Sequence, residues 1–199
     1  MEPTTSLREV KKQHMRRALV DSALRQFIER GYEETSLDDI CASLLVSPRT
    51  LQRYFGGKEQ LALDWQYTAL ERFRVALAER PPGQRVADWW RDYVLHLAEL
   101  NERTELSREQ HLLVLSVPTL HTRRLAIIRE YEDLLTAAIE AERAPDGTSS
   151  HLRARLSAVV LLAASEGAFD EWVLRPGRRS LRALSAEAID VARTEFLPG

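Results

Sequence analysis

The sequence lacks the features of a secreted or membrane-inserted protein. It contains a single cysteine, Cys41, so no disulfide can form within one chain. Its apolar runs are all shorter than the roughly 18–20 residues that a membrane-spanning helix needs. The start, MEPTTSLREVKKQ, lacks the apolar segment of a signal peptide. We therefore expect a cytoplasmic protein that contacts no membrane.

Strand patterns and strong charge are missing as well. No stretch alternates apolar and polar residues for long, and no Asn-Gly pair marks a hairpin. The net charge is only −2, which is unlike a non-specific nucleic-acid binder. The charge balance neither supports nor excludes DNA binding, because placement matters more. Arg16, Arg17, Arg49, Arg53 and Lys58 can share one surface.

Apolar residues at helical spacing are what the sequence contains instead. In residues 8–30, Val20, Ala23, Leu24 and Phe27 recur at i, i+3, i+4 and i+7, and Gly31 follows as a stop. Two short helices come next. Six further helices are expected at about 58–80, 84–101, 105–115, 119–143, 150–174 and 181–196. The sequence therefore predicts an all-α protein of about nine helices.

The composition changes near residue 60, where basic and helix-capping residues give way to aromatic and alanine-rich helices. We expect an N-terminal domain over residues 1–57, starting near residue 8, with three helices. A helical bundle over residues 58–199 would form the second domain. The chain is long enough to bury a core in each.

The first short helix is predicted from its cap. Ser36 stands three residues before Asp39, a capping-box arrangement, and Asp38 adds a second acid at the positive end of the helix dipole. The apolar residues of this helix form one stripe, Leu37, Ile40, Cys41 and Leu44. Cys41 is therefore expected to be a core residue rather than a redox sensor.

The second short helix has Ser47 as its cap and Pro48 at its first position. Only Leu51 and Phe55 need to be buried. A short helix with an apolar back and polar groups in front suits the DNA major groove. The pair of helices is thus predicted to be a helix-turn-helix motif whose outward residues are Arg49, Thr50, Gln52, Arg53 and Tyr54.

Lys58 stands at the start of the next expected helix, where its charge opposes the helix dipole. A cation there is unfavourable unless an anion occupies the site. With the free backbone N–H groups, Lys58 would form a phosphate pocket. The alternative is an exposed lysine without a partner.

The segment YEETSLDDICASLLVSPRTLQRYFGGKEQL resembles the DNA-binding domain of TetR-type bacterial transcriptional regulators. The similarity in specific motifs covers about residues 15–65. It implies that Ser47, Thr50, Tyr54 and Lys58 contact phosphates, and that Pro48, Arg49, Gln52 and Arg53 face base edges. This chain departs from the family in having Leu45 where glycine is usual in the turn. A leucine there would either open the turn or add packing.

The second domain would serve dimerisation and ligand binding, as the resemblance implies. Helices 150–174 and 181–196 carry small and apolar residues and are expected to meet their symmetry mates in a four-helix interface; the alternative is that these stripes fill the core of one chain. A largely apolar small molecule would bind among aromatic and polar residues. The expected lining residues, each of which could instead be a core residue, are Trp65, Trp89, Tyr93, His96, His111 and Trp172.

Enzymes and cofactor proteins find no support in the motifs. His96, His111, His121 and His151 lack metal-ligand spacing, and no Gly-x-Ser-x-Gly, phosphate-binding glycine loop or His-Glu-x-x-His occurs. We expect a homodimeric repressor without cofactor that binds a palindromic DNA operator and is released by a small molecule. The alternatives are a helical small-molecule-binding protein or enzyme whose head does not bind DNA, and a nucleoid-type structural protein.

Overall fold

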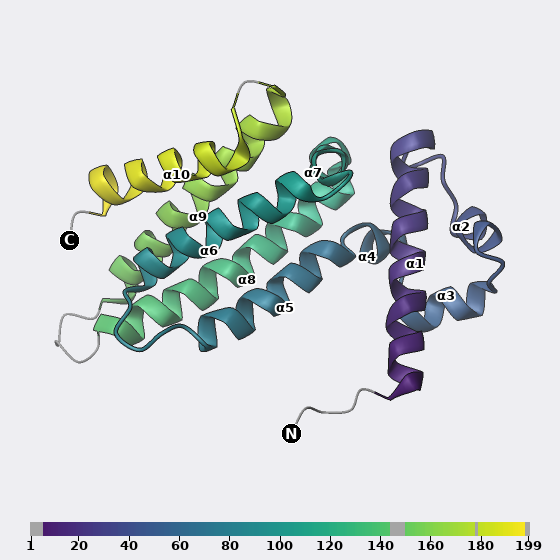
Figure 1. The fold of residues 1–199 in the computed structure, drawn as a ribbon, viewed down its shortest axis with the longest axis horizontal. Coiled ribbons are helices and arrows are strands. Elements are labelled where there is room, and N and C mark those ends of the chain that lie inside the picture. The colour runs from purple at the N-terminus through teal and green to yellow at the C-terminus, as the bar shows by residue number, and fades with distance from the viewer. Residues whose placement is uncertain (1–5, 144–149, 178, 198–199) are drawn as a thin grey trace.

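The computed structural model describes residues 6–143, 150–177 and 179–197. Over these residues it is all helical, as predicted, with ten α-helices and a short final π-helix (Figure 1). The helices are α1 (Leu7–Arg30), α2 (Leu37–Ser43), α3 (Pro48–Tyr54), α4 (Lys58–Ala62), α5 (Asp64–Ala78), α6 (Val86–Arg103), α7 (Ser107–Ser116), α8 (Pro118–Arg143), α9 (His151–Leu174), α10 (Leu181–Val191) and η2 (Ala192–Phe196). Within this part of the chain, no helix has the length and apolar character needed to span a membrane.

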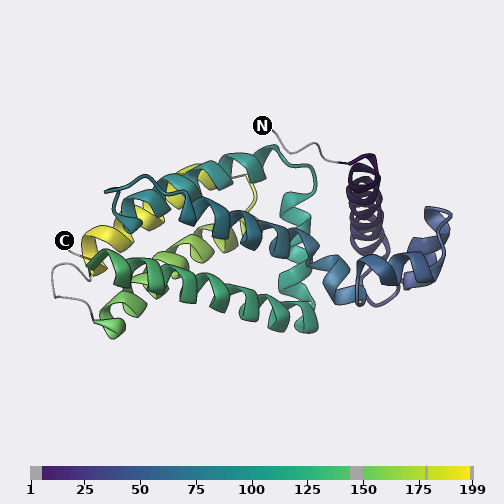
Figure 2. The same ribbon diagram turned by 90° about the horizontal axis from the view of Figure 1, so that it is seen from below.

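Helices α1, α2 and α3 gather at one end of the molecule, and we call them the head. Helices α5 to α10 form an elongated bundle, which we call the body, and α4 joins the two (Figures 1 and 2). The apolar stripe of α1 is confirmed, since Ala23, Leu24 and Phe27 are buried and Val20 packs against the same core. The stop at Gly31 is confirmed too, because its N–H donates to Phe27 O across 3.2 Å with a φ of 101°.

The prediction of one continuous helix over 58–80 was wrong. The helix is interrupted at Leu63, which lies between α4 and α5. The backbone angles of Leu63 are φ −100° and ψ 6°. No glycine or proline causes this break. Leu63 is fully buried, and the next residue, Asp64, forms an ion pair with Arg16 of α1. Tertiary contacts therefore turn the backbone here, which explains why there are ten α-helices rather than nine.

The core of the head continues into the body. Leu61, Leu63, Leu113, Val114 and Leu120 belong to the same buried cluster as the apolar residues of the head. Helix α7 lies in contact with α1, so the first helix of the head rests on the body as well as on α4. Because apolar packing is shared across this junction, a displacement of α4 or α7 would be felt by the head.

A second core fills the body around Phe73 of α5. The rings of Trp89, Trp90, Tyr93 and Tyr131 surround it at centroid distances between 4.8 and 5.9 Å. Two ion pairs hold α10 against α6, Arg182 with Glu99 and Arg91 with Asp190, and a third, Arg193 with Asp88, holds η2 there. Helix α9 packs between α8 and α10.

Candidate DNA-reading surface and ligand cavity

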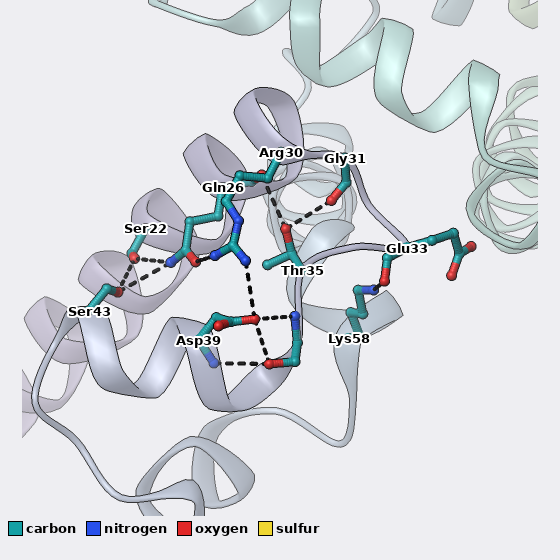
Figure 3. Close-up of polar contacts among 10 residues, drawn as sticks. Ser22, Gln26, Arg30, Gly31, Glu33, Thr35, Asp39, Ser43 and Lys58 are labelled. Atoms are coloured by element: carbon teal, nitrogen blue, oxygen red, sulfur yellow. Dashed lines mark hydrogen bonds and ion pairs between the residues drawn. The ribbon is translucent and has the colours of Figure 1, made fainter.

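The capping box predicted for α2 is confirmed. Asp39 N–H donates to Ser36 Oγ at 3.1 Å, and Ser36 N–H donates to Asp39 Oδ2 at 2.9 Å (Figure 3). The hydrogen bonds from Ser36 lower the pKa of the Asp39 carboxyl, with a smaller effect from Arg30, whose guanidinium lies 3.7 Å away. The start of α2 is therefore tied to the end of α1.

Further hydrogen bonds fix α2 against α1 (Figure 3). The Gln26 amide donates to Ser22 Oγ and Ser43 Oγ, both at 3.2 Å. The Thr35 hydroxyl lies 2.8 Å from Gly31 O and 3.2 Å from Gln26 O. These contacts hold the first helix of the motif at a fixed angle on its brace.

The turn between α2 and α3 keeps the tight geometry that glycine usually allows. Leu45 adopts the left-handed conformation with φ 53°, and its N–H donates to Ala42 O at 3.2 Å. Its side chain is 95% exposed. Neither expectation for Leu45 was right, because the leucine neither opens the turn nor adds packing.

Helix α3 has the predicted two faces. Ser47 caps it by accepting from Thr50 N–H at 3.1 Å, and Pro48 occupies the first position. On the inner face, Leu51 and Phe55 are each 1% exposed. Cys41, on the helix before, is buried beside them in the same core, as expected.

The outer face of α3 presents Arg49, Gln52 and Arg53, all exposed. None of the three makes a hydrogen bond or ion pair with another described residue, and Arg53 lies over the Tyr54 ring with 5.2 Å to its centroid. The half-buried residues Thr50 and Tyr54 flank this face, and the Thr50 hydroxyl is 2.9 Å from Ser47 Oγ. The residues predicted to contact DNA thus lie together on one short helix.

Two basic residues lie differently from the expectation. Arg16 does not join the outer surface: its guanidinium lies over the Phe55 ring at 4.8 Å and pairs with Asp64. Lys58 lies over the Tyr32 ring at 4.2 Å, and its ammonium is 3.5 Å from Glu33 O (Figure 3). These partners offset part of the Lys58 charge, and the phosphate contact expected of Lys58 stays a prediction.

The body contains a cavity of about 290 Å³ to which all five helices α5 to α9 contribute. Its aromatic and polar lining includes Trp65, Gln66, Trp90, His111, Arg124, Tyr131, Glu166 and Phe169. Aliphatic side chains such as Val94, Ile127 and Leu162 complete the walls. A partly open, mostly apolar space with a few polar groups is typical of a small-molecule site.

Of the six lining residues expected from the sequence, Trp65 and His111 line this cavity. Trp89, Tyr93, His96 and Trp172 do not. Trp89 and Tyr93 stack on each other at 5.1 Å beside Phe73, and His96 is exposed. The face of α6 that lines the cavity is the neighbouring one, with Trp90, Val94, Leu97 and Asn101, so the shared face was chosen one residue out of register.

Charged and titratable groups inside the cavity balance one another. Arg124 and Glu166 form an ion pair, and burial raises the pKa of the Glu166 carboxyl despite the nearby guanidinium. Burial lowers the pKa of His111 to about 4, so its ring is neutral at pH 7. His111 Nδ1 lies 2.8 Å from Ser107 O and must donate to it, which leaves Nε2 as an acceptor.

A third feature is an exposed apolar stripe on α9. Leu152, Leu156, Val159, Ala163 and Gly167 are exposed at helical spacing along one side of it. A groove of about 600 Å³ runs between this helix and α10. Small residues of α9 line one side of it, and Val191 of α10 and Phe196 of η2 are among the residues of the other side. Other members of the expected stripes, Ala158, Leu162 and Leu181 among them, fill the core of the single chain instead.

Metal-binding geometry is not found in the described part of the chain. None of its residues form a group of three or more His, Cys, Asp or Glu side chains that could hold an ion. His111 is enclosed by Trp65 and Phe169, while His96 is exposed on α6. The chemistry offered by both sites is therefore hydrogen bonding, charge and aromatic contact.

A braced helix-turn-helix followed by a helical body with an internal cavity defines a DNA-binding transcriptional regulator. The family model "Bacterial regulatory proteins, tetR family" matches residues 19–64. Over the whole chain, a similar protein is the HTH-type transcriptional regulator TcmR of Streptomyces glaucescens, 32% identical over 201 residues that cover 96% of this chain and 88% of TcmR. The chain belongs to the TetR family of bacterial regulatory proteins.

Solved structures share the fold over nearly the whole length. A TetR-family regulator from Syntrophomonas wolfei matches with a TM-score of 0.74 at 18% identity, covering 92% of this chain and 95% of its own. SmeT in complex with triclosan matches with a TM-score of 0.71 at 19% identity, covering 94% and 98%. FadR of Bacillus subtilis with stearoyl-CoA matches with a TM-score of 0.64 at 18% identity, covering 89% and 97%.

Proposed function

We propose that this regulator is a homodimeric, ligand-responsive repressor that binds a palindromic operator through α3 and leaves it when a small molecule enters the body cavity. The observation that carries the proposal is the outer face of α3. The side chains of Arg49, Gln52 and Arg53 are exposed there without a hydrogen bond or ion pair to another described residue, on a helix capped at its start and docked through Leu51 and Phe55. The proposed role requires no catalytic step and places the protein in the cytoplasm with the DNA.

The side chains of α3 match the chemistry of base edges. An amide such as Gln52 can bond adenine through two hydrogen bonds, and a guanidinium such as Arg49 or Arg53 can do the same with guanine. Each such pair is worth roughly 1–3 kcal/mol of discrimination against a wrong base. Pro48 would approach the bases, and phosphates would be contacted by Ser47, Thr50, Tyr54 and Lys58, of which Lys58 would have to reach DNA from its place on Tyr32.

The dimer would form through α9 and α10. The exposed stripe of α9, with Leu152, Leu156 and Val159, is too apolar for a surface left to water, and Phe196 adds to it beyond α10. A two-fold axis through this face would bring two copies of α9 and α10 together as four helices. The two α3 helices would then enter successive major grooves about 34–36 Å apart.

The ligand response would pass through the start of α5. Trp65 and Gln66 line the cavity directly after Asp64, and Asp64 holds Arg16 of α1. Arg16 in turn lies over Phe55, at the end of α3. A ligand that shifts the start of α5 would therefore change the angle of the head, and a typical coupling of about 1–3 kcal/mol lowers DNA affinity roughly 5- to 150-fold.

The test is selection of the fragments that the full-length protein binds from genomic DNA, followed by sequencing. The proposal expects a short palindrome enriched in the bound fragments and gel shifts that a small molecule from cell extracts reverses. Fragments without any common sequence would contradict it.

Lys58→Ala supplies a further check on the same operator. If Lys58 contacts a phosphate, the variant binds all sequences more weakly and the slope of log affinity against log salt falls by about one. Glu59→Ala, at the neighbouring position, is the matched control because it removes an acid and should not lower that slope. A slope unchanged in Lys58→Ala would remove Lys58 from the contact set.

A further inference from the structure

We infer that the body cavity takes a small, neutral aromatic molecule that carries both a hydrogen-bond acceptor and a hydroxyl donor. The inference rests on the proposed ligand response and names the chemical class of the effector. At about 290 Å³ the cavity lies just below the range usual for small-molecule sites, about 300–1,000 Å³, which favours a small ligand. Three properties of the lining lead to this class: ring contacts, unpaired polar atoms and paired charges.

Aromatic rings from different helices form one continuous wall. The ring centroids of Trp65 and His111 are 4.6 Å apart, and those of His111 and Phe169 are 5.0 Å apart with an interplanar angle of 21°. Trp90 and Tyr131 add rings from α6 and α8. Rings favour offset or edge contacts with other rings, so a flat aromatic ligand would extend this wall more favourably than an alkyl chain.

Two polar atoms of the lining are buried without a partner. Trp65 Nε1 and Gln66 Oε1 make no hydrogen bond with any described residue, and Gln66 as a whole is only 7% exposed. A buried donor or acceptor without a partner is rare in folded proteins. They belong to consecutive residues at the start of α5, and both atoms are shielded from the cavity, so the two side chains would have to turn toward a ligand that satisfies them: a carbonyl oxygen accepting from the Trp65 indole and a hydroxyl donating to the Gln66 amide.

Two other polar side chains of the cavity, Trp90 and Asn101, are already satisfied and would not define the ligand. Trp90 Nε1 donates to Ser165 Oγ at 3.1 Å, and the Ser165 hydroxyl donates to Leu161 O at 2.9 Å. The Asn101 amide donates to Leu97 O at 2.9 Å and accepts from the Ser107 hydroxyl at 2.7 Å. Among the described lining residues, Trp65 and Gln66 are the two with a fully buried polar atom that lacks a partner, and we take them as the recognition pair.

The buried ion pair of the cavity disfavours an ionic ligand beside Arg124 and Glu166. Arg124 and Glu166 are paired with each other, and Arg72, the remaining charged residue of the lining, is exposed to water. An anion would have to displace Glu166 from Arg124 and leave a buried carboxylate unpaired; a cation would leave the guanidinium unpaired. Breaking a buried ion pair in this way is strongly unfavourable. A neutral molecule disturbs neither charge.

The experiment measures binding of three matched probes to the full-length protein by isothermal titration calorimetry at pH 7. The probes are a naphthalene with a hydroxyl and an acetyl group on opposite rings, its methoxy analogue, and the hydroxynaphthoate with a carboxylate in place of the acetyl group. We expect the hydroxy ketone to bind best, the methoxy compound about fivefold more weakly because it cannot donate, and the carboxylate at least about tenfold more weakly.

Variants tie the preference to the two residues. Trp65→Phe keeps a ring but removes the N–H, and Gln66→Leu removes the amide at similar size; each should weaken the hydroxy ketone about fivefold. Trp89→Phe, outside the cavity, makes the same change and should leave the affinity as it is. Tighter binding of the carboxylate, absence of binding by the hydroxy ketone, or equal binding by all variants would overturn the inference.

Gel shifts with the operator separate the two proposals. If the protein binds its operator and only charged compounds release it, the ligand class is wrong and the regulator function stands. If no operator is bound, the proposed function fails whatever the probes do. The probe series on the wild-type protein also decides the ligand class should a variant fail to fold.

Discussion

The head and the body both hold side-chain polar groups that make no hydrogen bond or ion pair within the described chain, but they hold them in opposite ways. On α3, Arg49, Gln52 and Arg53 point into solvent from one helix. In the cavity, Trp65 Nε1 and Gln66 Oε1 are buried, inside a lining drawn from five helices. The first arrangement suits a large, charged partner that arrives from outside. The second suits a small, neutral one that must be enclosed.

The two sites are nevertheless not independent. The junction of α4 and α5 belongs to both, because Leu63 packs in the core of the head while Trp65 lines the cavity. Allostery requires a physical element that two sites bias, and this junction is one element that touches both. The following predictions test how far the two regions can be separated.

The largest expected effects come from removing one buried ring in each region. Phe55 in the head and Phe73 in the body are 1% and 0% exposed, so Phe55→Ala and Phe73→Ala should each lower the free energy of unfolding by about 3–5 kcal/mol. Urea unfolding measures this loss. Phe55→Ala should also abolish operator binding while the cavity still binds the hydroxy ketone. Phe73→Ala should weaken binding of the hydroxy ketone more than it weakens operator binding. If each variant weakened operator binding and ketone binding equally, the division into two regions would be contradicted.

The next largest effect is a pH dependence from His111. Its folded-state pKa, about 4, lies below the value of 6.5 expected when unfolded. The unfolded chain therefore takes up a proton between these values and the folded chain does not, so this contribution to stability is present above pH 6.5 and is lost as the pH falls toward 4. The full difference is about 3 kcal/mol.

Urea unfolding of wild type and His111→Gln at pH 7 and pH 4.5 isolates this contribution, because the carboxyls titrate in both proteins. The variant should lose less stability on acidification. If both proteins lose the same amount of stability, His111 becomes protonated in the folded protein, and the neutral state assigned to its ring is wrong.

A smaller effect is expected at the junction. Asp64→Asn removes the charge that holds Arg16, so the ligand should lower operator affinity by less than the roughly 5- to 150-fold effect expected for the wild type. Fluorescence anisotropy with and without the ligand measures this ratio. Asp21→Asn is the matched control. Asp21 also pairs with an arginine, Arg17 at 3.9 Å, but this pair is exposed to solvent and therefore weak. An undiminished ligand effect in Asp64→Asn would exclude this ion pair from the coupling.

The smallest effect concerns the turn of the motif. Leu45 has φ 53° and an exposed side chain, so Leu45→Gly removes the strain of a left-handed leucine and loses no packing. It should stabilise the protein by up to about 1 kcal/mol, since the greater freedom of glycine in the unfolded chain offsets part of the gain. Leu44→Gly, with an ordinary φ of −109° and a half-buried side chain, should destabilise it. The opposite order in thermal unfolding would contradict this account of the turn.

The head could be predicted from the sequence because its signals are local. Ser36 with Asp39, and Ser47 with Pro48, mark where α2 and α3 begin, and both caps are present. The spacing of Leu51 and Phe55 then determines which side of α3 faces out. Lys58 was the exception, since its partners Tyr32 and Glu33 lie 25 or more residues earlier in the chain. Helix-dipole reasoning could not include them.

The body could be predicted as helices with two of its cavity residues, Trp65 and His111, and little more, because the cavity is assembled from five helices. Trp90 was missed as a lining residue since Trp89, Tyr93 and His96 form an equally regular face of α6, and only packing against Phe73 decides which face turns toward the cavity. Gln66, Arg124 and Glu166 carry no local signal at all. The break at Leu63 was missed for the same reason, since a buried leucine and a distant arginine cause it.

The central claim is that the outer face of α3 binds DNA while contributing nothing to folding. The most direct measurement compares the wild type with the combined variant Arg49→Ala, Gln52→Ala and Arg53→Ala, by operator binding in anisotropy and by urea unfolding. We expect the affinity to fall at least about 100-fold, from roughly 1–3 kcal/mol per lost base contact, with an unfolding free energy within about 0.5 kcal/mol of wild type. Unchanged operator affinity in a folded variant would contradict the account.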